Sequence, residues 1–398
     1  MVTWAKVFRP NPLTCVRCHN TLTAVSGNRF PRAKRVTIGD VAALAGVSKA
    51  TVSKSLGDGN YSIAEDTQRR IAAAVEELDF QPNAIARDLK RRRTQTVGVI
   101  VASVENPVYA ELIAGVDQVL GSSEYTLIFG SSEGSAAKEA KVVRSMRQRQ
   151  VDGIVMASVT MQDREVGQLA SSGLDVVLAS RNVLSNSVDT VVVDNLSGAR
   201  QAVEHIAGHG HHRVAHIAGP QNVVPFAQRR QAYADMVAAG ALDDDGDLLV
   251  LADASTQEAG AAAVDQLLDL AEPPTAVFVG GDGMALGVLE ACDRRGVRIP
   301  EDLAVVSFDN ISVARMPGVG LTTVDSKARE IGRLAARQLL ARIESRLLET
   351  RAAGSDGADG DEPQGDDDAL RTGTGRAPYV QVLPTTLIRR RTCGCNQT

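Results

Sequence analysis

The pattern of apolar and polar positions changes near residue 97. Residues 36–93 carry short amphipathic, basic stretches that predict helices. From Val97 onward, apolar runs of strand length alternate with amphipathic helical stretches, which predicts repeated βα units and a parallel, doubly wound sheet. Eight strands are many for one sheet, so two similar lobes are expected. The expected strands are Val97–Ala102, Thr126–Gly130, Gly153–Met156, Asp175–Leu178, Thr190–Val193, Val214–Ile217, Ala276–Val279 and Ala304–Phe308.

Two segments break this pattern. Residues 1–35 show no periodicity, and we interpret them as a disordered extension or as upstream sequence that does not belong to the protein. Residues 350–378 contain a Gly- and Asp-rich run that cannot bury enough apolar surface to offset the entropy of ordering. We therefore expect a disordered acidic loop there, followed by a last strand at Tyr379–Ile388.

Composition and charge sharpen this prediction. The 398 residues suggest two or three domains, and an aromatic content of 3% implies the aliphatic core that suits a helix-covered parallel sheet. Residues 1–96 hold 16 Lys/Arg against 8 Asp/Glu, a net charge of +8, and the remainder holds 27 against 40, a net charge of −13. A basic first quarter on an acidic body suggests that the first quarter meets a polyanion.

The same inventory predicts a cytoplasmic location. No run of about 18 apolar residues is present, so neither a transmembrane helix nor a membrane partner is expected. The first 35 residues lack the apolar core of a secretory signal. The five cysteines form no even disulfide framework, which fits a reducing compartment.

Residues 37–56 carry the features of a helix-turn-helix. Thr37 can cap a first helix, and Asp40 can reach back to it. The small side chain of Ala42 permits close approach of two helices, and Gly46 permits a left-handed turn between them.

A second helix is expected over Ser48–Leu56, with Ser48 as its cap. Its inner side would carry Val47, Val52 and Leu56. Its outer side would carry Lys49, Ala50, Thr51, Ser53 and Lys54. The polar and basic side chains among them suit base edges and phosphates in a major groove. The alternative is an ordinary pair of amphipathic helices with a solvated basic face.

The whole run from Thr37 to Leu56 resembles the signature of the lactose-repressor family of regulators. The likeness continues through a third helix at about Glu65–Leu78 and through Pro82–Lys90, which is similar to the family's hinge helix. It extends from about Thr37 to Arg390. Two mild departures are Gly57, where the family often has Asn, and Ala64, where it often has a Ser cap.

The resemblance implies roles in reading DNA. Lys49 and Ala50 occupy the two positions that most often set the operator sequence, and Lys54 a position that contacts a base. Leu89 matches the leucine that the family wedges into the minor groove, although an ordinary core leucine is the alternative. The implied DNA-binding residues are Thr37, Ser48, Lys49, Ala50, Thr51, Ser53, Lys54, Asn83, Ala86, Leu89 and Lys90.

The resemblance also implies an all-α head on a two-lobed α/β body like a periplasmic binding protein. The chain would cross between the lobes near Asp194–Leu196, near Thr323–Val324 and in the acidic loop. The implied domains are a helix-turn-helix domain at 36–82, a hinge helix and linker at 83–96, an N-terminal lobe at 97–194 and 324–349, and a C-terminal lobe at 195–323 and 379–391.

A small-molecule effector would bind between the lobes, at the carboxyl ends of the strands. Arg and Asp side chains suit the vicinal hydroxyls of a sugar or polyol, and a purine is an alternative. The expected effector-binding residues are Asn106, Tyr109, Arg181, Asp194, Arg229, Asp282 and Asp309. Alternatively, Asp194 and Asp309 only cap helices, and Arg181 forms a structural ion pair.

Metal and catalytic chemistry are not expected. Cys15, Cys18 and His19 resemble half of a zinc site, but its other half could only be Cys393 and Cys395, at the opposite end of the family's fold. A histidine cluster at 205–212 is interpreted as surface residues at a helix C-terminus. No nucleophile–base pair is legible, so we expect neither an enzyme nor a cofactor.

Taken together, these features predict a homodimeric repressor that binds a pseudo-palindromic operator under the control of a ligand. The paired Arg and Asp side chains favour a sugar as that ligand. One alternative is a regulator of the same fold that responds to a purine or another metabolite. A solute-binding protein would need a signal segment and no helix-turn-helix. A sugar-modifying enzyme would need a catalytic constellation that the sequence does not show.

Overall fold

The computed structural model describes residues 36–56, 63–80, 93–184, 188–355 and 377–395. The chain divides into two compact units, Met1–Asn83 and Ala84–Thr398. The N-terminal extension, the predicted hinge helix and positions 356–376 of the predicted acidic loop lie outside the described residues. Among the described helices, none is both long and apolar enough to cross a membrane.

The first unit contains the predicted three helices, α1 (Ile38–Ala45), α2 (Lys49–Ser55) and α3 (Glu65–Glu77). Ala42 and Val52 are 4% and 0% exposed, and Val47 and Leu56, also expected on the inner side, are partly buried against the same cluster. A small residue at position 42 and a β-branched residue at position 52 let the helices close on one apolar cluster. That cluster consists of Val41, Ala42, Ala45, Val52, Ile71, Ala74 and Phe80.

The ends of α1 and α2 are built as the sequence predicts. The amide of Thr37 donates to the carboxylate of Asp40 at 2.8 Å, which closes the start of α1. Gly46 follows α1 with φ +67°, in the left-handed region that a side chain disfavours. Ser48 Oγ then accepts the Thr51 amide at 3.1 Å and caps α2. Local chemistry therefore sets the angle between the two helices.

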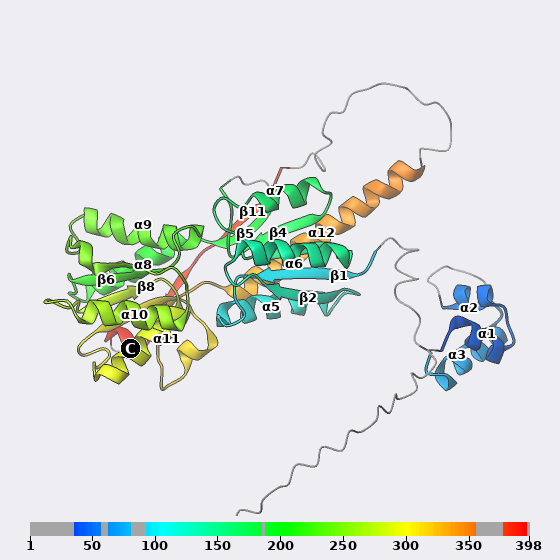
Figure 1. Cartoon of the computed structure of the whole chain (residues 1–398), viewed down its shortest axis with the longest axis horizontal. Coiled ribbons are helices and arrows are strands. Elements are labelled where there is room, and N and C mark those ends of the chain that lie inside the picture. The colour runs from blue at the N-terminus through cyan, green and yellow to red at the C-terminus, as the bar shows by residue number, and fades with distance from the viewer. Residues whose placement is uncertain (1–35, 57–62, 81–92, 185–187, 356–376, 396–398) are drawn as a thin grey trace, which may run out of the picture. The chain divides into compact units, whose positions relative to one another are not determined.

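The second unit holds two six-stranded sheets, which define two lobes (Figure 1). The first sheet has the order β11-β5-β4-β3-β1-β2, and all its neighbours are parallel. Its inner strands are buried almost throughout, which explains their continuous apolar runs. Its strands are β1 (Thr96–Val101), β2 (Thr126–Ser131), β3 (Gly153–Ala157), β4 (Asp175–Ala179), β5 (Asp189–Val193) and β11 (Val380–Leu383).

The second sheet has the order β12-β10-β9-β8-β6-β7. It is parallel except for β12, which runs antiparallel to β10. The carboxyl ends of the parallel strands lie at one edge of each sheet, where ligands usually bind in such folds. Its strands are β6 (Val214–Ala218), β7 (Leu249–Leu251), β8 (Ala276–Val279), β9 (Ala304–Asp309), β10 (Thr322–Asp325) and β12 (Thr386–Ile388).

Helices cover both faces of each sheet (Figure 1). In the first lobe, α5 (Pro107–Leu120) packs with α12 (Ala328–Ser355), whereas α6 (Ala136–Gln148) and α7 (Arg164–Ser171) contribute to a separate apolar cluster. In the second lobe, α8 packs with α9 and α10 packs with α11. Their bounds are α8 (Asn195–Gly208), α9 (Val224–Ala238), α10 (Gln257–Leu268) and α11 (Asp282–Arg295). Short 3₁₀ turns are η1 (Gly246–Leu248), η2 (Ser312–Arg315) and η4 (Arg391–Cys393).

The described chain passes between the lobes three times, and two passages differ from the prediction. The passage after β5 lies where we expected it. The second follows Asp325, because Thr323 and Val324, where we expected it, lie within β10 and pair with β9. The third lies between β11 and β12 rather than in the acidic loop. The single strand expected at Tyr379–Ile388 is two strands, because β11 extends the first sheet beside β5 and β12 joins the second. Pro384, which lacks an amide donor, separates them. Residues 379–383 therefore belong with the first sheet.

The long helix α12 also departs from the prediction. We expected order to end at residue 349, but α12 continues to Ser355. The sequence up to Ala353 contains residues that favour helix, and the Gly- and Asp-rich run begins only at Gly354.

Two glycines let α5 and α12 approach closely. A Cβ on Gly115 would lie 2.0 Å from the Arg329 carbonyl oxygen, and one on Gly332 would lie 2.1 Å from the Leu112 oxygen. Backbone atoms of the facing helix cannot yield as a flexible side chain can. The contact between these two helices therefore requires glycine at both positions.

Gly115→Ala is accordingly expected to destabilise the body by about 1–3 kcal/mol, the usual cost of overpacking. Gly167→Ala on α7 is the matched control, because its Cβ would meet no atom within 4 Å. That change should raise stability by about 0.5–1 kcal/mol through helix propensity. Urea unfolding followed by circular dichroism measures both, and equal effects would contradict the close-contact explanation.

Candidate DNA-binding surface and inter-lobe site

The first unit presents a polar and basic surface along α2. Lys49, Ala50, Ser53 and Lys54 are exposed, and Thr51 is partly buried. Thr37 and Ser48 lie at the amino-terminal ends of α1 and α2, where their polar groups form the caps described above. The sequence therefore predicted correctly which side chains of α2 face outward.

The predicted hinge residues lie outside the described part of the chain; they are Asn83, Ala86, Leu89 and Lys90. From Arg93 onward, hydrogen bonds hold the chain at the amino-terminal edge of the first sheet. The amides of Thr94 and Gln95 donate to the Asp152 carboxylate at 3.1 and 2.9 Å. Arg93 donates to the Tyr125 hydroxyl at 2.5 Å. The entry into β1 therefore has a defined position.

Arg229 of α9 is the centre of a charged cluster at the carboxyl edge of the second sheet. Its side chain is buried, and its guanidinium lies 3.6 Å from the centre of the Phe308 ring. Its nitrogens donate to Asn195 Oδ1 at 2.9 and 3.1 Å and to the Gly280 carbonyl at 2.5 Å. Asp309 Oδ1 lies 3.6 Å from Nη2. The cation thus has several polar partners, as burial requires.

Asp309 and its neighbour adopt unusual backbone conformations. Asp309 has φ +122° and Asn310 has φ +57°, at the point where β9 ends. Such values are uncommon outside glycine and are often found at functional sites. They turn the chain directly beside Arg229.

Asp282, the first residue of α11, is fully buried. Its Oδ1 accepts the Thr323 hydroxyl at 2.7 Å, and its Oδ2 accepts the Ile311 amide at 3.0 Å. The carboxylate therefore braces β10 and the loop after β9. Asp282 was predicted to contact the effector, and the structure gives it internal partners.

The first lobe contributes two of the predicted side chains to the same region. The guanidinium carbon of Arg181 lies 5.9 Å from the centre of the Tyr109 ring, and its Nη1 donates to the Ser158 carbonyl at 3.2 Å. Both residues are close enough to influence the charge of Arg229. The lobes therefore bring residues from α5, from the segment after β4 and from α9 into one region.

Asn106 and Asp194 cap helices. Asn106 Oδ1 accepts the Val108 amide at 3.2 Å at the start of α5. Asp194 accepts both the amide and the hydroxyl of Ser197, at 2.9 and 2.6 Å. Asn106 also meets the second lobe, since a Cβ on Gly283 would lie 3.7 Å from its amide carbon. The contacts of Asp194 in the structure are therefore those of a helix cap, the alternative that we considered for this residue.

Sequence reasoning missed Asn195, which holds Arg229 from the start of α8. It also missed Phe308, whose ring supports the same guanidinium. Both adjoin predicted residues, Asp194 and Asp309. The signal available was therefore their position at strand ends, but an amide or a phenyl ring has no distinctive motif there.

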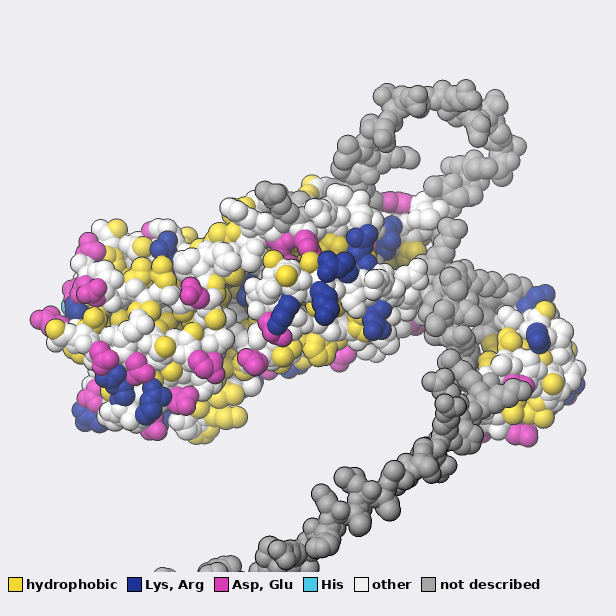
Figure 2. Space-filling view, in the orientation of Figure 1, with side chains coloured by type: hydrophobic (Ala, Val, Ile, Leu, Met, Phe, Trp, Pro, Cys, Tyr) yellow, Lys and Arg dark blue, Asp and Glu magenta, His cyan; other side chains and the backbone are white. Residues whose placement is uncertain are grey.

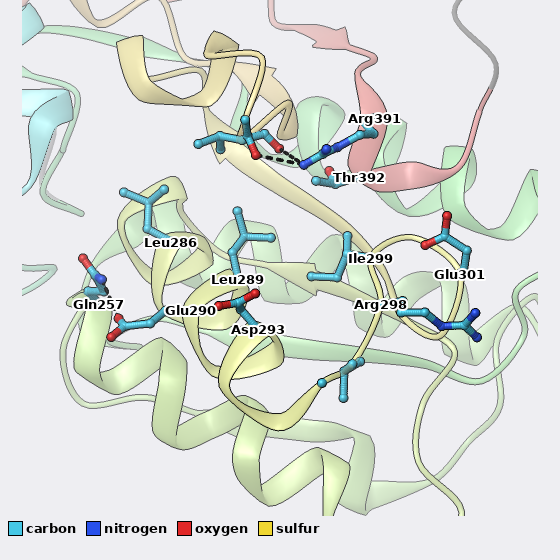
Figure 3. A pocket seen from close by; sticks show the side chains of 14 residues that line it. Gln257, Leu286, Leu289, Glu290, Asp293, Arg298, Ile299, Glu301, Arg391 and Thr392 are labelled. Carbon is cyan, nitrogen blue, oxygen red and sulfur yellow. Dashed lines mark hydrogen bonds between the residues drawn. The ribbon is translucent and has the colours of Figure 1, made fainter. Parts of the chain in front are cut away.

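Grooves reach this cluster from two sides. One of about 350 Å³ is lined by Asp309 and by residues from the starts of α5 and α12. Another of about 230 Å³ is lined by Asp194, Asn195 and Val380. A larger groove of about 760 Å³ lies between α11 and the segment around Arg391 (Figure 3), and it has none of the predicted effector residues in its lining. The inter-lobe cluster is therefore the candidate effector site because of its charged and polar side chains, and not because its grooves are the most spacious.

Burial dominates the electrostatics of this cluster. It raises the pKa of Asp282, and the nearby charge of Asp309 raises it further. Burial also raises the pKa of Asp309, although the Arg229 guanidinium opposes that shift. Two neighbouring carboxyl groups in a buried site favour a state with fewer negative charges.

Comparison with known proteins follows the same division of the chain. Residues 37–83 match the model of "Bacterial regulatory proteins, lacI family", and residues 203–353 match the model "Periplasmic binding protein-like domain". Catabolite control protein A of Priestia megaterium is 35% identical over 305 residues, covering 76% of this chain and 91% of that protein. The repressor PurR of Vibrio atlanticus is 32% identical over 317 residues, covering 79% and 94%.

Among solved structures, the complex of the transcriptional regulator CelR with cellobiose has a TM-score of 0.62 at 29% identity, covering 90% of this chain and all of that one. Fold and surface together define a helix-turn-helix regulator with a two-lobed body. The chain belongs to the lacI family of bacterial regulatory proteins, and it is a DNA-binding transcriptional regulator.

The inter-lobe carboxyl groups predict a pH-dependent stability. Folding raises the pKa of Asp282, so the folded protein binds a proton at this carboxyl group more tightly than the unfolded chain does. The resulting stabilisation is fully present below about pH 4, where the unfolded side chain is protonated, and it is lost progressively as the pH rises above that value. Asp282→Asn removes this titration. From pH 5 to pH 8, the wild type should therefore lose stability relative to Asp282→Asn, by on the order of 1 kcal/mol.

Urea midpoints of both proteins at the two pH values measure this difference. Asp253→Asn is the control, because Asp253 is exposed. Parallel pH profiles for wild type and Asp282→Asn would show that Asp282 ionises normally in the folded protein.

Proposed function

We propose that this regulator is a homodimeric repressor whose affinity for a pseudo-palindromic operator is set by a sugar bound between its lobes. One observation supports the effector half of the proposal: Asn106 of the first lobe meets Gly283 of the second beside two charged pairs, Arg181 with Tyr109 in the first lobe and Arg229 with Asp309 in the second. A ligand held by both lobes favours one relative lobe arrangement, which is the requirement for a switch.

In the head, Lys49 is the main base-reading side chain of the proposal. It is exposed at the start of α2, the usual place for base contacts in a helix-turn-helix. Ala50 offers only a methyl group, so it can contact a thymine methyl but cannot pair with a base edge. Thr51, Ser53 and Lys54 add polar and phosphate contacts. In the linker, Asn83, Ala86, Leu89 and Lys90 are assigned to the operator's centre by the family resemblance.

Lys49→Ala should weaken binding to the operator by about 1–3 kcal/mol, the worth of one good base contact. Lys141→Ala is a control of equal charge change, because Lys141 is an exposed side chain of α6, where basic side chains gather (Figure 2). Fluorescence anisotropy with DNA upstream of the gene, across a range of salt concentrations, measures both variants. Equal losses in the two variants would refute base reading by Lys49.

The effector chemistry follows from the side chains at the inter-lobe cluster. A guanidinium fork and a carboxylate together match the donors and acceptors of vicinal hydroxyls. Tyr109, which lies beside Arg181, is the aromatic ring that a pyranose or furanose ring would contact once the ligand enters the cluster. The cellobiose complex of CelR and the ribose operon repressor of Halalkalibacterium halodurans make these two sugars the first to test. A purine is the alternative, since aromatic rings surround Arg229.

Arg181→Lys and Asp309→Asn should each weaken effector binding by about 10–100-fold while leaving operator affinity within about twofold, because each change removes paired hydrogen bonds to the ligand. Asp253→Asn is the exposed control. Isothermal titration with cellobiose, ribose and hypoxanthine measures ligand affinity, and anisotropy measures DNA affinity. Unchanged ligand affinity in both variants would place the effector elsewhere, and release of DNA by hypoxanthine alone would select the purine alternative.

A further inference from the structure

A set of metal-ligating side chains meets in the second lobe, in the part of the chain that the structure describes. His205 lies in the last turn of α8, and Cys393 and Cys395 lie at the end of η4 and just after it. One ligand atom from each residue lies within 4.8 Å of the other two. We expected His205 to be a surface residue and considered the two cysteines only together with Cys15 and Cys18. The structure instead brings them to His205, 188 and 190 positions away in sequence.

The distances suit a tetrahedral metal ion. His205 Nε2 lies 3.6 Å from Cys395 Sγ. Zinc bonds of about 2.1 Å to nitrogen and about 2.3 Å to sulfur place such ligand atoms roughly 3.6 Å apart. In the structure the two sulfurs are joined as a disulfide, with the Cα atoms 5.5 Å apart. The reduced pair would present two sulfur ligands from the same short segment.

The segment that carries the cysteines is held firmly in place. Thr392 Oγ1 donates to the Val305 carbonyl at 2.7 Å and accepts the Thr322 amide at 2.9 Å. Gly394 has φ +74°, a left-handed conformation that turns the chain between the two cysteines. Cys393 is 4% exposed, and Cys395 and His205 are partly buried. The ligands are therefore positioned by contacts that do not depend on a metal.

We propose that the reduced Cys393 and Cys395 thiolates and His205 Nε2 bind one Zn²⁺, with water as the fourth ligand. Two thiolates and an imidazole are the ligands that zinc prefers, and three protein ligands commonly leave one position to water. The C-terminal end of α8 adds a favourable helix dipole for a cation.

Cys393 and Cys395 can bind zinc only as reduced thiolates, so the zinc-bound state and the disulfide exclude each other. A low-molecular-weight thiol reductant supplies two electrons and two protons, which break the Cys393–Cys395 bond and leave two protein thiols and the oxidised reductant. Zinc binding then displaces the two thiol protons to solvent. Oxidation of the pair by a disulfide would release the metal, so occupancy reports the redox state of the surroundings.

The neighbouring His209 is not assigned as a ligand. Its ring centre lies 4.4 Å from that of His205, but its Nδ1 is engaged with the His205 carbonyl at 2.7 Å. His209 therefore offers a matched control: a histidine on the same helix end, next to the site.

The test uses the full chain in a Cys15→Ser/Cys18→Ser background, reduced with a phosphine and freed of metal. Co²⁺ is added first, because thiolate-to-cobalt charge transfer shows how many thiolates bind, and Zn²⁺ then displaces it. We expect one ion per chain with a two-thiolate spectrum. Cys395→Ser should halve the charge-transfer intensity and weaken Zn²⁺ binding more than about 100-fold, since losing even an outer-shell partner costs about 10–100-fold.

His205→Gln should weaken Zn²⁺ binding by more than about tenfold, and His209→Gln should change it less than about twofold. Zn²⁺ should also raise the melting temperature of the parent protein but not that of Cys395→Ser. A cooperative melting transition of Cys395→Ser shows that this variant folds. The proposal is overturned if reduced protein with titratable thiols shows no charge-transfer band, if His205→Gln and His209→Gln behave alike, or if metal binding disappears with Cys15 and Cys18. None of these readouts depends on DNA or effector binding.

Discussion

The buried guanidinium of Arg229 is the constraint on which the inter-lobe region depends. A charge that is 5% exposed persists only when its hydrogen bonds and its counter-charge are supplied by the protein. Here the partners come from three places: Asn195 at the start of α8, Gly280 after β8 and Asp309 at the end of β9. Moving any of these elements leaves the cation poorly paired, so the carboxyl edge of the second sheet behaves as one unit.

A contiguous set of contacts joins this edge to the entry of the chain into the body. Helix α12 begins close to the inter-lobe grooves, and near its other end Arg346 bonds Asp175 at 2.8 Å and the Asp152 carbonyl at 3.0 Å. The carboxylate of Asp152 holds the amides of Thr94 and Gln95, which follow the predicted hinge. Because glycines bring α5 against α12 without side chains between them, this helix pair can transmit a displacement rather than absorb it.

Much of the fold was predictable from the sequence because its signals are local. The helix-turn-helix follows from Thr37, Gly46 and Ser48, whose capping and turn chemistry needs no distant partner. The buried parallel strands follow from their apolar runs. The sequence did not predict the short strands β7 and β10, whose three and four residues are too few for a pattern. It also did not predict the division of residues 379–388 between two sheets.

In the candidate sites, too, the sequence predicted residues whose roles depend on neighbouring positions, but not residues whose roles depend on contacts with distant segments. The outward face of α2 was predictable from helical spacing, and Asp309 from its place at the end of an apolar run. Arg229, which lies in α9, was predicted from the family resemblance. Asn195 and the meeting of His205 with Cys395 were not predictable, because their roles depend on which strand ends and helix ends the topology brings together. Asp282 was predicted at the right edge, but its contacts with Thr323 and Ile311 are internal.

In the proposed switch, the ligand between the lobes and the DNA bound by the helix-turn-helix domain are linked through one equilibrium. Linkage requires that each changes the affinity of the other by the same factor. The most direct measurement is therefore isothermal titration of the effector sugar into the protein alone and into the protein saturated with operator DNA. We expect the affinity for the sugar to change by the same factor as the operator affinity changes when the sugar binds, about 5–150-fold for typical coupling. Equal sugar affinities with and without operator would contradict it.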